Sequence, residues 1–323
     1  MALLTGNRMT LIDLAKRTKD GAVLAIAEVM NKVNTVLDDA VWIQANGETQ
    51  HITSKRISLP TGSWRKINQG VALEKSSTQQ IVEGIGMLEA YAHVDTALVE
   101  WAPNPAAFRL SEDLAFVEGM SQTLATTIFY GTTAGAPEKF DGFATRYAHL
   151  TTLGTSAVHN VHGYGGTGSS LNSVWIVQWG SPSVHMIYPK NSTTVGLKVQ
   201  DDGILTVYDS SGNPFKVYQT HFKQYGGICV RDDRCVQRVC NIPATAANLS
   251  GKLIDAFRQM PQGGANAVIY ANTTVLAALD KEAKDKVNVN YGPTDAFGRP
   301  TMFFRGIPVK QVDALLSTET AIT

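Results

Sequence analysis

The sequence predicts an α+β fold, because helical and strand-like patterns both run over long parts of the chain. The stretch SEDLAFVEGMSQTLATTIFYG, residues 111–131, repeats its apolar side chains at the helical period and predicts a long amphipathic helix. Residues 45–80 are polar and weakly alternating, which is typical of a hairpin. After Phe143, short apolar runs are separated by Gly, Ser, Pro and Asn, as in strands joined by turns.

The composition favours a protein that associates with itself. The chain has 323 residues and a mass of 34.8 kDa, enough for one large domain or two modest ones. Charged residues make up 17%, against about 25% in average proteins, and 28 basic residues balance 28 acidic ones. Zero net charge promotes association. It argues against a dedicated nucleic-acid binder, which is usually basic, although a container for DNA stays compatible with it.

The sequence shows no targeting signal. No stretch approaches the roughly 20 apolar residues of a membrane span, and the N-terminal MALLTGNRMTLIDLAKRTKDG carries charges throughout, unlike a signal peptide. We therefore expect synthesis in the cytosol and no membrane partner. The three cysteines, Cys229, Cys235 and Cys240, are odd in number and cannot all pair, which predicts reduced thiols.

The first quarter of the chain is predicted to hold an arm, a helix and the hairpin. Residues 1–19 form a polar arm, and a helix is predicted from Asp20. Its apolar residues recur at steps of three and four, and they are Val23, Ile26, Met30, Val33 and Leu37. The hairpin at 45–80 has its tip at Pro60–Gly62 and too few large apolar residues to bury itself. Isolated two-stranded ribbons are marginal in water, so we expect the hairpin to lie on a neighbouring subunit.

Two helices are predicted between the hairpin and Gly131. The first covers 79–100 and is ended by Pro103 and Pro105. The second, at 111–130, has Ser111 as its N-cap and acidic residues in its first turn. Gly131 ends this rod, which should be about 30 Å long. Its predicted buried stripe consists of Leu114, Val117, Ser121, Leu124 and Ile128.

The rest of the chain is predicted to be mainly strands, with two helices. The expected strands are 174–179, 184–189, 204–209, 215–221 and 267–271, with a tight hairpin at 228–239 and a late strand pair at 302–315. A helix at 249–260 should turn Leu253, Ile254 and Phe257 inward. Asn272 or Thr273 should cap a second helix that ends near Lys286, and 290–300 should be a loop.

Three patterns that carry chemistry elsewhere have plainer explanations here. GYGGTG at 163–168 matches G-x-G-x-x-G, but a dinucleotide site needs a helix after it, and strand-like sequence follows. We therefore expect a loop. The cysteines are spaced x5 and x4, whereas a zinc site has closer pairs and four ligands, so we expect buried thiols on strands, no metal and no disulfide. His159 and His162 leave metal binding open as an alternative in the Gly-rich loop.

The sequence contains no recognisable catalytic set. The seven histidines form no H-x-x-x-H or H-E pattern, and neither a G-x-S-x-G elbow nor a Walker motif occurs. Paired aspartates stand at expected turns and helix ends, where Asp makes local hydrogen bonds. We therefore expect no enzyme activity, no catalytic residue and no cofactor. A cytosolic hydrolase whose site is invisible in the sequence is the alternative.

The hairpin carries the candidate site. Trp64, Arg65 and Lys66 lie near its tip, with Arg56 and Lys75 on its two arms. Basic residues interleaved with an aromatic can bind nucleic acid, and Trp and Arg are also enriched at protein interfaces. Because the net charge is zero, we favour an inter-subunit interface.

Six stretches, taken in their order and spacing, match one known family. They are MTLIDLAKRTKDG (9–21), AEVMNKVNTVLDDA (27–40), HITSKRISLPTGSWRKINQGV (51–71), IFYGTTAGAPEKFDGF (128–143), RDDRCVQRVCNI (231–242) and FFRGIPVKQVDAL (303–315). Through them the chain resembles tailed-bacteriophage major capsid proteins with the Hong Kong 97-type fold, most of all the epsilon-fifteen type of short-tailed phages.

The resemblance implies both an architecture and a function. The implied parts are an N-terminal arm and helix at 1–44, an E-loop at 45–80, a P-domain at 81–139 with its spine helix at 111–130, an A-domain at 140–290, and a C-terminal return to the P-domain at 291–323. The implied function is that of a major capsid protein, which assembles as hexamers and pentamers into an icosahedral head around double-stranded DNA.

The resemblance also implies partners and a location. The partners are further copies of the chain, a portal, a separate scaffolding protein, a decoration protein, and packaged DNA held by non-specific contacts. The chain begins almost at the arm, so no fused scaffolding region is expected. The location is the virion capsid, assembled in the host cytoplasm. A phage tail or decoration protein is the structural alternative, and it should lack the long helix.

Overall fold

The structure is a computed structural model, and it describes residues 18–19, 22–23, 32–150, 159–192, 195–285 and 303–323. In these ranges no helix is both long and apolar enough to cross a membrane. The chain divides into two compact units. Unit 1 comprises residues 1–34, 87–126 and 193–225, and unit 2 comprises residues 35–86, 127–192 and 226–323.

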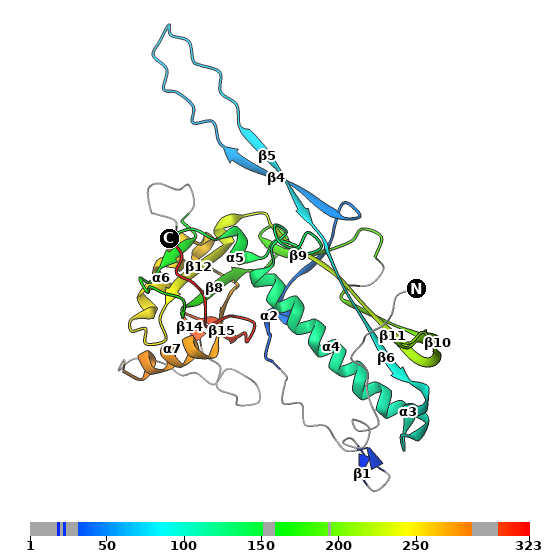
Figure 1. Ribbon diagram of the computed structural model, residues 1–323. Helices are drawn as coiled ribbons and strands as arrows, with labels where there is room; N and C mark the ends of the chain where they lie inside the picture. Colours follow the sequence, from blue (N-terminus) through cyan, green and yellow to red (C-terminus); the bar gives the residue numbers. More distant parts are fainter. Residues whose placement is uncertain (1–17, 20–21, 24–31, 151–158, 193–194, 286–302) are drawn as a thin grey trace. The chain divides into compact units, whose positions relative to one another are not determined.

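Unit 1 combines a long helix with antiparallel strands (Figure 1). Its elements are β1 (Thr18–Lys19), β2 (Ala22–Val23), β6 (Gly86–Asp95), α3 (Thr96–Trp101), most of α4 (Pro105–Tyr130), β10 (Leu197–Tyr208) and the larger part of β11 (Pro214–Val230). β10 and β6 both pair with β11. The helix α4 packs on this sheet, where the Phe116 ring stacks on Phe222 with 5.7 Å between centroids. Met120 and Ala92 are buried in the same cluster.

The predicted long helix is present as α4, but its start lies six residues before Ser111. Asn104 is the cap, because its side chain accepts a hydrogen bond from the Ala107 backbone N–H at 3.2 Å. Pro105 therefore begins this helix, where its missing N–H costs nothing. Ser111 lies inside the helix and bonds the Phe108 carbonyl. The predicted end at Gly131 is confirmed.

The predicted buried stripe of this helix is partly wrong. Leu124 and Ile128 are buried as expected, whereas Leu114 is exposed. Phe108 and Phe129 are fully buried instead, so the apolar face is rotated from the one that the heptad-like spacing indicated.

The helix predicted at 79–100 is wrong. The segment forms the end of β5, all of β6 and only a short helix, α3, which Asp95 caps through a 2.9 Å hydrogen bond from the Ala97 N–H. Burial alternates along β6, so Leu88 is half-buried while Met87 and Tyr91 are exposed. Apolar residues four apart satisfied the helical template, but pairing with β11 decided the conformation.

The helix predicted from Asp20 is also wrong where the structure describes it. β2 covers Ala22–Val23 and pairs with β1, and Val33 is not helical. Only α2 at Val36–Asp39 is helical. Residues 1–17 of the predicted arm, and 20–21 and 24–31 of the predicted helix, lie outside the described residues.

Unit 2 is built on a six-stranded mixed sheet in the order β14-β15-β13-β8-β12-β7. Its elements are α2, β3 (Trp42–Gln44), β4 (Gln50–Ser58), β5 (Ser77–Gly84), α5 (Phe143–Arg146), β7 (Val161–Gly163), β8 (Asn172–Gln178), β9 (Val184–Tyr188), the end of β11, η1 (Asp233–Cys235), β12 (Val236–Ile242), α6 (Leu249–Gln259), η2 (Pro261–Gly263), β13 (Ala267–Ala271), α7 (Thr273–Asp285), β14 (Phe303–Phe304) and β15 (Ile307–Gln311).

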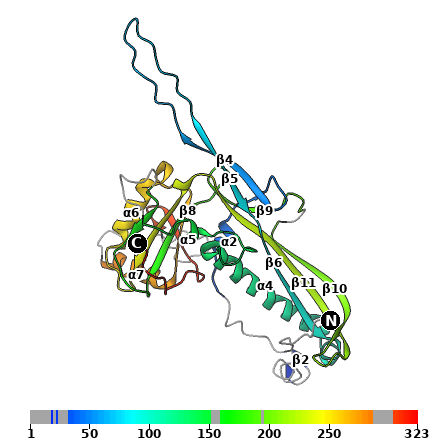
Figure 2. The same ribbon diagram turned by 45° about the horizontal axis from the view of Figure 1, so that its top comes forward.

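Both faces of this sheet are covered, which explains the continuous apolar run of β8. Val174 and Ile176 belong to the core formed with α6 and α7, the two helices that lie beside the sheet in Figures 1 and 2. Trp175 points to the opposite face, as alternate residues of a strand do. There its ring lies 5.7 Å from that of Phe143 and 6.2 Å from that of Phe129.

Most of the predicted strands and helices after Phe143 are confirmed. β8, β9, β13, α6 and the β14–β15 pair lie where they were expected, and β10 and β11 are longer than predicted. Asn272 caps α7 through a 3.0 Å bond from the Val275 N–H. Ile254 is 39% exposed, so its predicted inward orientation is wrong. The predicted loop at 290–300 lies outside the described residues.

The tight hairpin predicted at 228–239 is wrong. β11 pairs with β9 at its end, whereas β12 pairs with β7 and β8 in the six-stranded sheet. The intervening turn η1 therefore carries the chain from one sheet to another rather than back along the same one. A turn-like sequence between two apolar runs does not distinguish these two connections.

Candidate functional site: the β4–β5 hairpin

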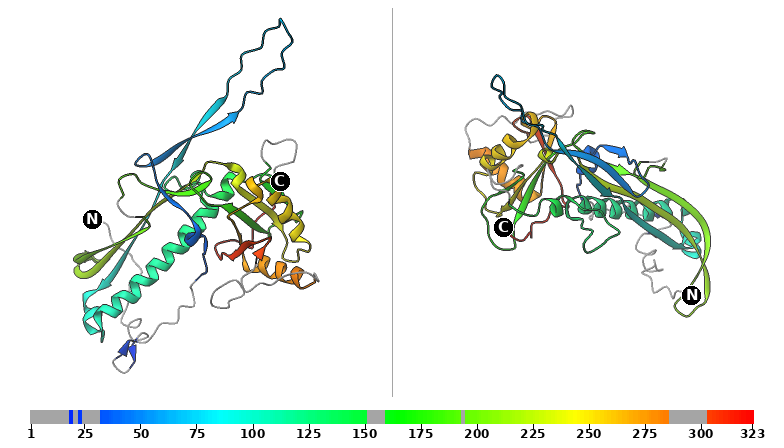
Figure 3. Two further views of the ribbon diagram at one scale, coloured as in Figure 1. Left: turned by 180° about the vertical axis from the view of Figure 1, so that it is seen from behind. Right: turned by 90° about the horizontal axis from the view of Figure 1, so that it is seen from above.

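The hairpin predicted between the arm and the long helix is formed by β4 and β5, which pair antiparallel from Gln50↔Gly84 to Ser58↔Ser77. Residues 59–76, here called the hairpin tip, contain no strand. Figures 1 and 3 show the tip extended beyond the two strands, away from the other elements of unit 2. The paired strands themselves, residues 50–58 and 77–84, are here called the hairpin root.

Large apolar side chains of the tip are almost entirely exposed. The exposed fractions are 70% for Leu59, 105% for Trp64, 89% for Ile67 and 102% for Leu73. Arg65 and Lys66 are exposed as well. Large exposed apolar side chains gathered on one segment favour an interaction site or an aggregation liability. The tip therefore has apolar side chains that its own chain does not cover.

One carboxylate organises the tip from within. Glu74 accepts hydrogen bonds from the backbone N–H groups of Thr61 and Gly62, at 2.7 and 3.0 Å. Gly62 has a positive φ of 69°, which glycine adopts without strain. The two backbone donors hold the pKa of Glu74 below its ordinary value. Glu74 thus closes the turn that the Pro60–Gly62 sequence predicted.

The root is anchored by a buried ion pair. Arg146 of α5 binds Glu83 of β5 through Nη1 and Nη2, each 2.6 Å from a carboxylate oxygen, and Glu83 is only 5% exposed. Arg146 also donates to the carbonyls of Asp141 and Ile228. On the other strand, Lys55 makes an ion pair with Asp233. Both strands are therefore fixed to the rest of unit 2.

The loop before α5 sets the position of Arg146. Gly142 lies so close to the end of α4 that an added Cβ would stand 2.6 Å from the Thr127 carbonyl oxygen. Gly131 is equally tight, with 2.4 Å to the Phe140 oxygen. Phe140 and Phe143 are buried. The stretch from Gly131 to Gly142 is thus a close-packed connector, in which only glycine fits at both ends.

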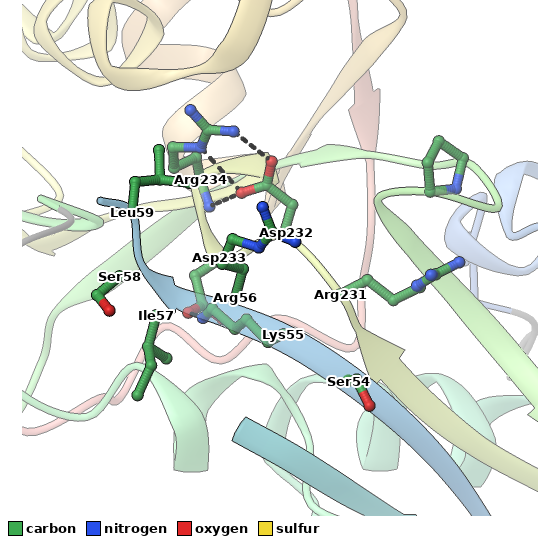
Figure 4. A pocket seen from close by; sticks show the side chains of 11 residues that line it. Ser54, Lys55, Arg56, Ile57, Ser58, Leu59, Arg231, Asp232, Asp233 and Arg234 are labelled. Carbon is green, nitrogen blue, oxygen red and sulfur yellow. Dashed lines mark hydrogen bonds and ion pairs between the residues drawn. The ribbon is translucent and has the colours of Figure 1, made fainter. Parts of the chain in front are cut away.

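A half-open cavity of about 700 Å³ lies beside the root (Figure 4). Its charged lining consists of Lys55 and Arg56 from β4 and of Arg231, Asp232, Asp233 and Arg234 from the turn after β11. In Figure 4, Arg234 faces Asp232, and its Nη2 lies 2.8 Å from the carboxylate. Basic groups outnumber acidic ones in this lining. The cavity offers charged and backbone groups to another chain but no nucleophile paired with a base.

A histidine lies where β4 crosses the sheet of β9 and β11. His51 is half-buried on β4, and its ring centroid lies 5.8 Å from that of the buried His185 on β9. Burial is the main cause that lowers the pKa of His185 to about 4, and His51 and Arg231 add to it against a smaller opposing effect of the Gly180 backbone. His185 is therefore neutral at physiological pH.

The three cysteines are buried and free. Cys229 lies on β11 and Cys240 on β12, as the spacing suggested, whereas Cys235 lies in η1. Burial raises the pKa of each thiol to about 11. The expectation that none of them binds a metal stays a prediction.

The glycine-rich stretch at 163–168 leads from β7 into β8, so no helix follows it. It lacks the strand–turn–helix context in which a helix N-terminus meets a pyrophosphate. His162 at its start is buried, and its Nε2 lies 2.9 Å from the Gln237 side-chain oxygen. His159 packs against it with ring centroids 4.3 Å apart.

Sequence reasoning located the tip but missed the groups that fix the root. Glu83 fell within the segment wrongly expected to be helical, and Arg146 stood in no recognised motif. Only their pairing in space makes them visible. The Asp–Gly–Phe sequence just before Arg146 is the signal that could have located this part of the site, because Asp–Gly is typical of a tight turn.

Comparison with known proteins decides the family. The chain matches the family described as major capsid protein GP7 over residues 18–323. The chain belongs to this family. Among solved structures, the cryo-EM structure of bacteriophage Epsilon15 is 33% identical, with a TM-score of 0.75 and 100% of each chain covered. The capsid of bacteriophage JBD30 is 12% identical, with a TM-score of 0.53 and 96% of each chain covered.

Membership of the GP7 family confirms the resemblance read from the sequence, and the likeness to Epsilon15 confirms the Hong Kong 97-type α+β fold. The family is one of structural proteins. No curated protein matches the chain.

Proposed function

We propose that this bacteriophage major capsid protein assembles as hexamers and pentamers into an icosahedral head that encloses double-stranded DNA. The observation that carries the proposal is the hairpin tip, whose Trp64 is fully exposed although the root beneath it is firmly anchored. A rigidly held ribbon with uncovered apolar side chains suits a lattice in which a neighbouring copy covers it. Each copy has several neighbours, so modest contacts reinforce one another.

The parts of the chain have separate roles in this proposal. Residues 1–44 serve as arm and helix region, 45–80 as the E-loop, 81–139 as the P-domain with the spine helix, 140–290 as the A-domain and 291–323 as the return to the P-domain. α2 and β4 to β5 supply the first two parts, and α4 supplies the spine.

Trp64, Arg65 and Lys66 form the proposed inter-subunit contact. Trp64 acts as the apolar anchor, because buried Trp residues dominate interface energies. Arg65 and Lys66 pair with acids of the neighbouring copy and set register and orientation more than affinity. The zero net charge of the chain keeps long-range repulsion between copies small.

The further partners follow from the role of a head. A portal, a separate scaffolding protein and a decoration protein bind the shell, and packaged DNA meets its inner surface without sequence recognition. The subunits assemble in the host cytoplasm and end in the virion. The role is structural and needs no catalytic group or cofactor.

Electron microscopy of the purified full-length chain tests the proposal directly. Polyhedral shells are the expected product, formed by the chain alone or with the scaffolding protein added. Tubes or fibres under all conditions would instead favour a tail protein. Discrete small particles that never enlarge, even with a scaffold, would contradict the proposal and reopen the hydrolase alternative.

A further inference from the structure

Three donor side chains from separate strands converge at the hairpin root. They are His51 on β4, His185 on β9 and Cys229 on β11, and one ligand atom from each lies within 4.8 Å of those of the other two. His185 and Cys229 are direct cross-strand partners, so both side chains emerge on the same face of the sheet. His51 reaches them from the hairpin.

The buried histidine of this cluster lacks the partners that buried polar groups normally have. His185 is 2% exposed, and among the described residues neither of its ring nitrogens makes a hydrogen bond of normal geometry. Buried polar groups without a partner are rare and costly. A neutral imidazole with a free lone pair, a buried thiol and a second imidazole are the ligand set that borderline-soft d¹⁰ metal ions prefer.

We propose that His51, His185 and Cys229 bind a zinc ion, which clips the root of the hairpin to the sheet of β9 and β11. This inference goes beyond the assembly function proposed above, and it departs from the expectation, based on cysteine spacing alone, that Cys229 holds no metal. The spacing argument considered ligands close in sequence. These three come from strands far apart in sequence.

The geometry needs only a small contraction. Tetrahedral ligands at zinc–ligand distances of about 2.0–2.3 Å are about 3.5 Å apart. The three ligand atoms of this cluster lie within 4.8 Å of one another. His51 Nδ1 accepts a 3.2 Å hydrogen bond from the Asn46 N–H, and coordination through this nitrogen replaces that long bond. On binding, a Zn–S bond forms and the Cys229 thiol proton passes to solvent. Water occupies the fourth position, since His51 is only half-buried.

The charges around the cluster are mixed. Arg231 faces both histidines and opposes a cation. Glu83, which lies opposite His51 in the β4–β5 pair, and the Cys229 thiolate favour a bound cation. Glu83 is itself held by Arg146 and is not available as a ligand. Thiolate coordination therefore has to supply the affinity, which makes Cys229 the decisive ligand.

Zinc content and cobalt spectroscopy test the site on the unassembled, full-length chain. After treatment with EDTA and addition of Zn²⁺, we expect about one equivalent to be retained and the thermal midpoint to rise, whereas Mg²⁺ and Ca²⁺ should have no effect. Co²⁺ should give a thiolate-to-metal charge-transfer band. H51Q and C229S should each lower the zinc affinity by more than about 100-fold, beyond what loss of an outer-shell partner costs.

C235S and C240S are the matched controls, because both remove a buried free thiol of the same unit that lies outside the cluster. They should keep full zinc binding and the cobalt band. H51Q changes a half-buried residue, so it keeps the test valid if C229S fails to fold. Absence of zinc binding by the native chain, or equal loss in C235S and C229S, would overturn the site. Shell formation is scored separately, so failure here leaves the assembly proposal standing.

Discussion

The root and the tip of the hairpin belong to one ribbon, yet they are held by different means. The root is fixed by the Arg146–Glu83 pair and by Lys55 on Asp233, with Glu83 nearly inaccessible to water. The tip has Glu74 and its two backbone bonds, and its Trp64 is fully exposed. Changes in the root should therefore alter the stability of the subunit, and changes in the tip should alter assembly.

The largest effect is expected at the root, from Glu83→Gln. The substitution leaves the Arg146 guanidinium without its counter-charge in a mostly buried position, and breaking such a pair typically costs about 3–5 kcal/mol. Because Arg146 is 22% exposed, we expect the lower end of that range. Chemical denaturation of the unassembled subunit measures it.

The matched control for Glu83→Gln is Glu74→Gln in the tip, which makes the same chemical change at a fully exposed carboxylate. It should leave the free energy of unfolding close to that of the native chain. Equal destabilisation by the two variants would remove the distinction between root and tip.

The second effect concerns assembly alone. Trp64→Ala should fold normally, since the side chain is 105% exposed and touches no core, so its free energy of unfolding should stay within about 0.5 kcal/mol of the native value. At a subunit interface, loss of such an anchor typically costs about 2 kcal/mol or more per contact. The variant should therefore fail to close shells in electron micrographs.

Trp64→Phe keeps a large aromatic side chain and is the control for this prediction. It should assemble at a higher protein concentration than the native chain. If Trp64→Ala forms particles of unchanged number and thermal stability, the proposed role of the tip is wrong.

A third effect is expected in the connector between α4 and α5, which supports the hairpin. Gly142→Ala places a Cβ 2.6 Å from the Thr127 carbonyl oxygen, and overpacking of this kind typically costs about 1–3 kcal/mol. Gly135→Ala, in the same loop, meets nothing within 4 Å and is the control. Thermal melting should show a lower midpoint for Gly142→Ala only. A lowered midpoint for both would indicate that the loop is sensitive to any substitution.

The sequence predicted elements well where one local signal was sufficient. The end of α4 at Gly131, the cap of α7 at Asn272 and the turn of the hairpin each rest on a residue with a local geometric role. Family resemblance added the fold as a whole, because six stretches in order carry more information than any one of them.

The failures share a different cause. The segment 79–100 fits a helical pattern, but its middle part, Gly86–Asp95, forms the strand β6, because it pairs with β11, more than a hundred residues later in the chain. The ion pair of Glu83 with Arg146 and the cluster of His51, His185 and Cys229 are likewise set by contacts between elements far apart in the chain and not by sequence spacing. Contacts between residues remote in sequence leave no periodic signal in a single chain, so these parts of the site needed the structure.

The smallest effect is the pH response of the tip. Two backbone donors depress the pKa of Glu74 in the folded chain, so the order they provide is complete above the ordinary carboxyl pKa of about 4.3. It is lost only as the pH falls through the lower folded-state value. Hydrogen exchange at the amides of Thr61 and Gly62, corrected for its intrinsic pH dependence, should stay slow at pH 5 and rise in more acidic solution. In Glu74→Gln, which has no charge to lose, the protection of these two amides should not change with pH. The root, whose Glu83 is buried against Arg146, should keep its protected amides over the range in which the tip first opens. Simultaneous opening of root and tip would show that the ribbon responds as one body.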